Sequence, residues 1–161
     1  MSTNLHDPKD KAAKLLAYLR RLRNDRGAMA ALRAAINPAR RTRAWPILAE
    51  IGGIGDRICE TIAALFAYHP EETSSGNLGT TCRLLARTNP TFGLRFLRLL
   101  TCDRDELCDR LRPIIFAARA KDIPVNYETL FADLWFWGET VKTRWAKEFW
   151  MATDSPTKTT P

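Results

Sequence analysis

Apolar residues recur at helical spacing along almost the whole chain. From about residue 8 to residue 150 they return every three or four positions, as on the buried face of an amphipathic helix. No segment alternates apolar and polar residues over the length of a strand. The pattern predicts an all-α protein, a compact helical bundle of about seven or eight helices. The bundle is expected to form either one body or two small lobes.

Short polar residues and glycines indicate where these helices begin and turn. Asp7, Asp56, Asp103 and Asn126 each precede an apolar helical pattern and are predicted N-caps, because their side chains can accept a hydrogen bond from a free amide. Glu106 completes capping-box spacing with Asp103. The glycines at 52, 53 and 55 predict a turn, because glycine destabilises a helix interior.

Prolines and other breakers divide the pattern further. Gly27 is expected to end or kink the first helix, and Asn37-Pro38 to stop the second. The segment 69–76 is the most flexible internal loop by composition. Pro113 should kink a long helix or begin a new one.

Asn89-Pro90 marks the predicted boundary between two lobes. The N-terminal lobe would comprise residues 7–89 and the C-terminal lobe residues 90–152. Residues 1–6 and 153–161 are polar and are expected to form disordered tails.

The tryptophans favour a thick aromatic core in the C-terminal half. Trp135, Trp137, Trp145 and Trp150 follow helical spacing, which is more typical of core than of a base-stacking surface. Trp45 adjoins the basic cluster 40–43, and both a core and an interface role stay open for it.

The charge balance favours a polyanionic partner. With 25 Lys and Arg against 18 Asp and Glu, the net charge is +7, which suits nucleic acid before an anionic membrane. A merely soluble basic domain is the alternative. No apolar run approaches the roughly 18 residues of a membrane span, and the N-terminus lacks an apolar signal region. A cytoplasmic protein with no membrane partner is therefore expected, and its four cysteines should be reduced and mostly buried.

The sequence offers no constellation for catalysis. His6 falls in an expected tail and His69 beside Pro70, so neither is a convincing general base. Gly52–Gly55 lacks the Lys-Ser/Thr pair of a phosphate-binding loop. No cysteine has a metal-ligand spacing. We expect no enzyme activity, no metal, no cofactor and no small-molecule substrate.

The candidate functional residues are basic. Arg95 and Arg98 share one helix face, away from the apolar stripe of their helix. Arg57 and Arg104 fall at predicted helix N-termini, where the helix dipole opposes a cation. Either an external anion or a solvated surface charge, beside Asp105 and Glu106 in the case of Arg104, would explain the placement. The last helix carries a basic side, formed by Lys142, Arg144 and Lys147. Together these positions favour contacts along a phosphate backbone.

The order of short motifs resembles the CasB family, the small subunits of the type I-E CRISPR Cascade surveillance complex. In the C-terminal half the motifs are Leu99-Leu100, Asp103-Arg104, Leu107, Leu111-Arg112, Ile123-Pro124-Val125-Asn126-Tyr127, Leu130, Asp133-Leu134, Trp137, Val141-Lys142 and Trp145-Ala146-x-x-Phe149. The N-terminal half is similar through Arg26-Gly27, Leu32-Arg33, Trp45-Pro46, Leu78-Gly79 and Arg83. The sequence departs from the family pattern at Asn126, where an aspartate cap is usual, and at Pro113.

The resemblance implies a non-catalytic subunit that works with the other Cascade subunits and a second copy of itself. In this family two copies lie head to tail beside the CRISPR RNA and target DNA and stabilise the R-loop, in part through the displaced strand. The nucleic-acid-binding positions that it implies are Arg57, Arg83, Arg95 and Arg104, and more loosely Lys142 and Arg144. Alanine at Arg57, Arg83 or Arg104 is expected to leave folding nearly intact. The alternative is a helical protein–protein adaptor whose basic face meets an acidic partner.

Overall fold

The computed structural model describes residues 7–152, and within that range the regular structure is helical apart from one isolated bridge between Glu72 and Val125. The nine α-helices are α1 (Pro8–Leu22), α2 (Arg26–Arg33), α3 (Trp45–Leu48), α4 (Arg57–Tyr68), α5 (Leu78–Ala86), α6 (Phe92–Leu99), α7 (Arg104–Ala120), α8 (Tyr127–Trp135) and α9 (Glu139–Trp150). Three 3₁₀ helices connect them, η1 (Ala34–Ile36), η2 (Pro38–Ala44) and η3 (Ala49–Ile51). The predicted all-α class is confirmed. The expected tails at 1–6 and 153–161 lie outside the described residues.

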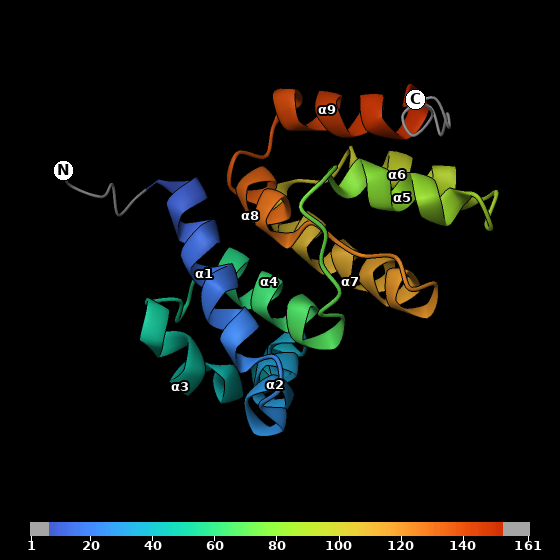
Figure 1. Cartoon of the computed structure of the whole chain (residues 1–161). Helices are drawn as coiled ribbons and strands as arrows, with labels where there is room; N and C mark the ends of the chain where they lie inside the picture. The colour runs from blue at the N-terminus through green and yellow to red at the C-terminus, as the bar shows by residue number, and fades with distance from the viewer. Residues whose placement is uncertain (1–6, 153–161) are drawn as a thin grey trace, which may run out of the picture.

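The helices form layers around one continuous core. Helices α5, α6 and α9 lie together at one end and α2 and α3 at the other, with α4, α7 and α8 between them (Figure 1). Buried side chains from Leu15 in α1 to Trp145 in α9 belong to one cluster. The boundary predicted near residue 89 falls between α5 and its packing partners α6 and α9. The division into lobes stays a prediction.

The predicted N-caps form the expected hydrogen bonds. The side chains of Asp7, Asp56, Asp103 and Asn126 accept from the amides of Lys9, Ile58 and Cys59, Glu106, and Thr129, at 2.8–3.1 Å. Three further caps were not predicted: Asp25 accepts from the Ala28 amide, Asn37 accepts from the Ala39 amide, and Asn77 forms a capping box with Thr80. These bonds satisfy amides that have no partner within their own helix.

Two of the predicted breaks differ in the structure. The first helix ends at Leu22 and Asp25 caps the next one, so Gly27 lies inside the first turn of α2 rather than ending α1. Pro113 lies inside the continuous helix α7, so it does not begin a new segment. Its side chain is exposed, where water can satisfy the carbonyl that loses its helical donor. The glycine turn is confirmed, with positive φ at Gly52 and Gly55.

The loop 69–76, expected to be flexible, is fastened to the connector before α8. His69 is buried, and its Nε2 donates to the Ile123 carbonyl at 2.7 Å. The Val125 amide donates to Glu71 O at 3.0 Å, and the Thr73 amide donates to Val125 O at 3.1 Å. The composition of the loop did not indicate these contacts.

The aromatic core is centred on Trp145. Its side chain is fully buried, and Nε1 donates to the buried carboxylate of Asp133 at 2.8 Å. Trp137 packs on it, with ring centroids 4.9 Å apart, and donates to Cys102 O. The core prediction is wrong for Trp150, which is 53% exposed. Trp150 occupies the last position of α9, where the helix extends past the core.

All four cysteines are free and buried, as predicted. Burial raises the pKa of each thiol, and that of Cys59 reaches about 12. The thiols are therefore protonated at neutral pH, which suppresses their nucleophilicity.

Replacing Trp145 by alanine should cost about 3–5 kcal/mol of stability, because it opens a cavity and removes the Nε1 donor from Asp133. Denaturant unfolding measures the loss. Trp150→Ala is the matched control and should cost far less, because half of that side chain faces solvent. Equal losses in the two variants would contradict this placement of the core.

Gly79→Ala should destabilise the protein by about 1–3 kcal/mol, because a Cβ at Gly79 would overlap the backbone carbonyl of Trp145 where α5 meets α9. Gly93→Ala is the matched control: it also changes the second residue of a helix, but a Cβ there meets nothing within 4 Å. The control should gain about 0.5–1 kcal/mol from reduced chain entropy. Melting curves of the two variants should therefore shift in opposite directions.

Candidate nucleic-acid interface

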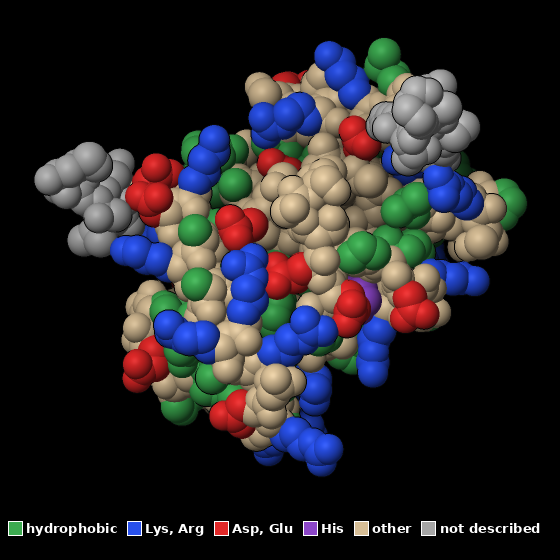
Figure 2. Space-filling view, in the orientation of Figure 1, with side chains coloured by type: hydrophobic (Ala, Val, Ile, Leu, Met, Phe, Trp, Pro, Cys, Tyr) green, Lys and Arg blue, Asp and Glu red, His purple; other side chains and the backbone are tan. Residues whose placement is uncertain are grey.

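The predicted basic residues come from five different helices. They lie on α4 (Arg57), α5 (Arg83), α6 (Arg95 and Arg98), α7 (Arg104) and α9 (Lys142 and Arg144). Figure 2 shows Lys and Arg side chains scattered over one face of the molecule, with Asp and Glu among them. Arg57 and Arg144 line two separate pockets.

Arg95 and Arg98 are exposed on α6, as their spacing predicted. The Arg95 guanidinium lies 5.7 Å from the centroid of the buried Phe92 ring, so its stem covers the apolar stripe. Both guanidinium groups can reach a partner without rearrangement of the core.

Arg104 makes contacts within the protein at the position where an external anion was expected. Its Nε donates to Leu134 O at 2.8 Å and its Nη2 to Trp135 O at 2.7 Å. These carbonyls end α8, where a cation is favoured by the helix dipole. Arg104 thus joins the start of α7 to the end of α8, and alanine at this position is no longer expected to leave folding nearly intact.

Arg83 also lies largely inside the fold. Only 16% of its side chain is exposed, and Nη2 lies 3.9 Å from a carboxylate oxygen of Glu148 on α9. This ion pair spans α5 and α9, so Arg83 contributes to the packing of the two helices.

The basic residues of α9 surround a buried carboxylate and an indole ring. Arg144 Nη2 lies 3.4 Å from Asp133 Oδ1, and the Lys142 ammonium lies 5.5 Å from the Trp137 ring centroid. Burial raises the pKa of Asp133, while the hydrogen bond from Trp145 and the charge of Arg144 act in the opposite direction. Arg144 is 56% exposed and keeps donors toward solvent.

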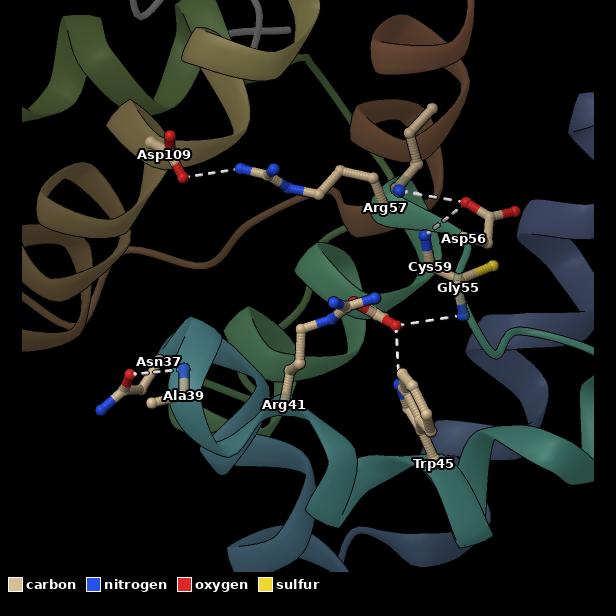
Figure 3. A network of polar contacts seen from close by, with 11 residues as sticks. Asn37, Ala39, Arg41, Trp45, Gly55, Asp56, Arg57, Cys59 and Asp109 are labelled. Atoms are coloured by element: carbon tan, nitrogen blue, oxygen red, sulfur yellow. Dashed lines mark hydrogen bonds and ion pairs between the residues drawn. The ribbon is translucent and has the colours of Figure 1, made fainter.

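Arg57 belongs to a group of arginines that the sequence did not bring together. Its Nη2 lies 2.6 Å from Asp109 Oδ1 across the space between α4 and α7 (Figure 3). Arg57 lines a pocket of about 490 Å³ with Arg41 of η2 and Arg112 of α7. We call these three residues the arginine rim. Arg41 and Arg112 were not predicted, because nothing in the sequence places η2 beside α7.

The buried carboxylate of Glu60 organises one side of the pocket (Figure 3). Glu60 is 4% exposed and accepts from Trp45 Nε1 at 2.9 Å, the Gly55 amide at 3.1 Å and Arg41 Nε at 3.2 Å. The Arg41 guanidinium also lies 5.3 Å from the Trp45 ring centroid. Trp45 is thus half-buried and bonded within the fold, and it fixes both Glu60 and the plane of Arg41.

A second arginine–aromatic group continues along α7 from Arg112. The rings of Tyr68 and Phe116 stack with centroids 3.8 Å apart. Arg112 flanks Phe116 at 5.5 Å and Arg119 flanks Tyr68 at 4.7 Å. Arg112 and Arg119 are seven residues apart, so helical periodicity could have placed them on one face of α7. Their aromatic partner Tyr68 comes from α4, and only the fold shows it.

The described residues contain no group of three or more His, Cys, Asp or Glu that could hold a metal ion. His69 uses Nε2 in a structural hydrogen bond. Within residues 7–152, no helix is long and apolar enough to cross a membrane.

The sequence and the fold both match a known family. Residues 15–150 match the family model described as CRISPR-associated protein Cse2, and the chain belongs to this family. A crystal structure of a Cse2-family CRISPR-associated protein from Thermus thermophilus is similar, with 28% identity, a TM-score of 0.74, and coverage of 88% of this chain and 98% of that one. A structure of CasB from Thermus thermophilus shares 27% identity over 88% of this chain and 98% of that one, with a TM-score of 0.72.

A third structure, CasB from M. ruber, has the same fold at 22% identity, with a TM-score of 0.72 and coverage of 88% of this chain and 93% of that one. No curated protein sequence matches this chain.

Arg104→Ala should lower stability by about 1–2 kcal/mol, because the two carbonyls at the end of α8 lose their charged donor. Thermal and denaturant melting measure the change. Arg98→Ala, at an exposed position of α6, removes the same charge and should change stability by less than about 0.5 kcal/mol. If both variants melt at the wild-type temperature, the contacts of Arg104 do not stabilise the fold, and its guanidinium group is free to bind a phosphate.

Proposed function

We propose that this chain is a non-catalytic, nucleic-acid-binding subunit of a type I-E Cascade complex. It stabilises the R-loop through contacts with the backbones of the guide, the target and the displaced DNA strand. Its partners are the other Cascade subunits, a second copy of itself, the CRISPR RNA and the target DNA, and it acts in the cytoplasm. Membership of the Cse2 family and the net charge of +7 support this proposal.

The arginine rim is the observation that carries the proposal. Arginines from η2, α4 and α7 converge on one pocket, although these elements are distant in sequence. Guanidinium groups bind phosphate oxygens with two parallel hydrogen bonds and do not read base sequence from such a contact. R-loop formation exchanges a DNA duplex for a hybrid of similar stability, so a few backbone contacts can shift the balance.

The adaptor alternative has support at another surface. Leu94 and Leu97 of α6 are 63% and 49% exposed, and Trp150 and Met151 at the end of α9 are 53% and 70% exposed. Trp150 packs against Phe96 of α6, so the two apolar groups adjoin. Exposed apolar side chains beside Arg95 and Arg98 suit contact with a protein. In a Cascade, this surface would serve assembly while the arginine rim contacts nucleic acid.

Removing an arginine of the rim and removing the charge of its acidic partner should change the affinity for single-stranded DNA in opposite directions. Arg57→Ala and Arg112→Ala remove phosphate partners and should weaken binding, whereas Asp109→Asn frees Arg57 from its ion pair and should strengthen it. Each lost phosphate contact should reduce the slope of log K against log salt by about 0.7. Fluorescence anisotropy at several salt concentrations measures both quantities, and preference among sequences should stay below about tenfold, roughly 1.4 kcal/mol.

Arg110→Ala is the matched control, because Arg110 is an exposed α7 residue paired with Glu106 and does not line the pocket. In complexes rebuilt with each variant, Arg57→Ala and Arg112→Ala should weaken R-loop formation equally for different targets, since the guide supplies sequence recognition. Unchanged affinity and salt slope in both rim variants, free and in the complex, would rule out this surface and favour the adaptor.

A further inference from the structure

The pocket lined by the arginine rim is larger and more apolar than a phosphate contact requires. Its volume of about 490 Å³ lies within the roughly 300–1,000 Å³ of small-molecule sites. Its walls include Ala35 and Ile36 of η1, Pro38, and Ala64 and Leu65 of α4. A phosphate held at the rim would leave Ala35, Ile36 and Pro38 facing water, so a ligand that fits the whole pocket has an anionic part and a flat apolar part.

We propose that this pocket holds one unpaired nucleotide of single-stranded DNA, with the base among the apolar walls and its phosphate at the arginine rim. The proposal rests on the function proposed above and specifies how the displaced strand is held. A base in a duplex would first have to leave its stack, whereas a displaced strand presents bases that are already unpaired. Binding in the pocket therefore selects for the single-stranded state.

The carboxylates of the pocket do not oppose an anion as strongly as their number suggests. Glu60 accepts hydrogen bonds from three donors, and one of them, Arg41 of the rim, balances its charge. Asp109 is 74% exposed, so its ion pair with Arg57 contributes little stability and can be exchanged for a phosphate. Three arginines against two carboxylates leave the lining with a net charge of +1.

The shape of the rim suits a base better than an acidic peptide. Contact with Trp45 and Glu60 holds the plane of the Arg41 guanidinium at the pocket edge, and a guanidinium plane is a surface on which bases stack. An Asp or Glu side chain could pair with the rim but has no flat group to cover Ile36 and Leu65. Beyond Arg112, the stack of Phe116 and Tyr68 leads to Arg119, which offers the next cation to a strand that follows α7.

Oligonucleotides that lack bases test the proposal in the full-length protein. The probe is a fluorescent oligo(dT) of about 12 nucleotides, compared with the same backbone carrying abasic sites throughout. Both carry the same phosphate charge, so a purely electrostatic surface binds them equally. If the pocket holds a base, the abasic strand should bind about tenfold more weakly, roughly 1.4 kcal/mol.

A variant that fills the pocket tests the location. Ala35→Phe projects a ring from a half-buried pocket wall, and it should reduce the affinity for oligo(dT) to that for the abasic strand. Ala39→Phe is the matched control at an exposed η2 position outside the lining, and it should keep the tenfold difference. If Ala35→Phe melts early, NMR of the wild-type protein gives the same answer: oligo(dT), but not the abasic strand, should shift the methyl signals of Ala35 and Ala64.

The outcomes separate this proposal from the function on which it rests. Equal affinity for the two strands, or a tenfold difference that persists in a folded Ala35→Phe variant, overturns the nucleotide pocket. Weakened binding in Arg57→Ala would then still support a phosphate-binding subunit. Tighter binding of oligo(U) than of oligo(dT) overturns the assignment to DNA. If neither strand binds and polyglutamate does, the nucleotide pocket and the nucleic-acid-binding function are both wrong, and the result supports the protein–protein adaptor.

Discussion

The hydroxyl of Tyr127 joins the start of α8 to the end of α4 in the middle of the fold. It is fully buried at the start of α8, lies 2.6 Å from His69 O and 3.2 Å from Leu65 O, and so binds the carbonyls that end α4. A buried carbonyl without a donor is costly, so α8 can leave α4 only by exposing these groups. Because α8 also packs on α1 and carries Asp133, the partner of Trp145 in α9, this one contact determines how the layers lie against one another.

Much of the arginine content of the chain maintains the fold. Arg104 caps the end of α8, Arg33 donates to Ala67 O near the end of α4, and Arg20 bonds both Glu72 and Glu128. A guanidinium has five donors in one plane, which lets it satisfy several carbonyl or carboxylate oxygens from different helices. The charge of +7 therefore overstates the positive surface that is available to a partner. Arginines that converge on one pocket from elements distant in sequence, as at the rim, give a better guide to function than net charge.

The parts of the fold that the sequence could predict are those encoded by neighbours in the chain. Helical period and N-caps such as Asp56 and Asn126 depend on contacts over three or four residues, and both were found correctly. The break between α1 and α2 was misplaced because Gly27 is a stronger signal by composition than Asp25, although the Asp25 side chain forms the cap. The candidate site was less predictable. The position of Arg104 at a helix start favoured an external anion, but its actual partners are the carbonyls of Leu134 and Trp135, some thirty residues away in the sequence.

The ion pair between Arg57 and Asp109 also bears on how tightly a free subunit can bind DNA. A phosphate that reaches Arg57 must displace Asp109, so the contact gains only the difference between two ionic partners. When the protein acts alone, the free energy gained by binding a phosphate at the rim is therefore small. In an assembly that holds the displaced strand beside the pocket, the second contact becomes intramolecular and its effective concentration rises to about the millimolar range. Under the proposed function, a contact that is too weak for the free subunit to hold stray DNA would still stabilise an open R-loop once the complex holds the displaced strand beside the pocket.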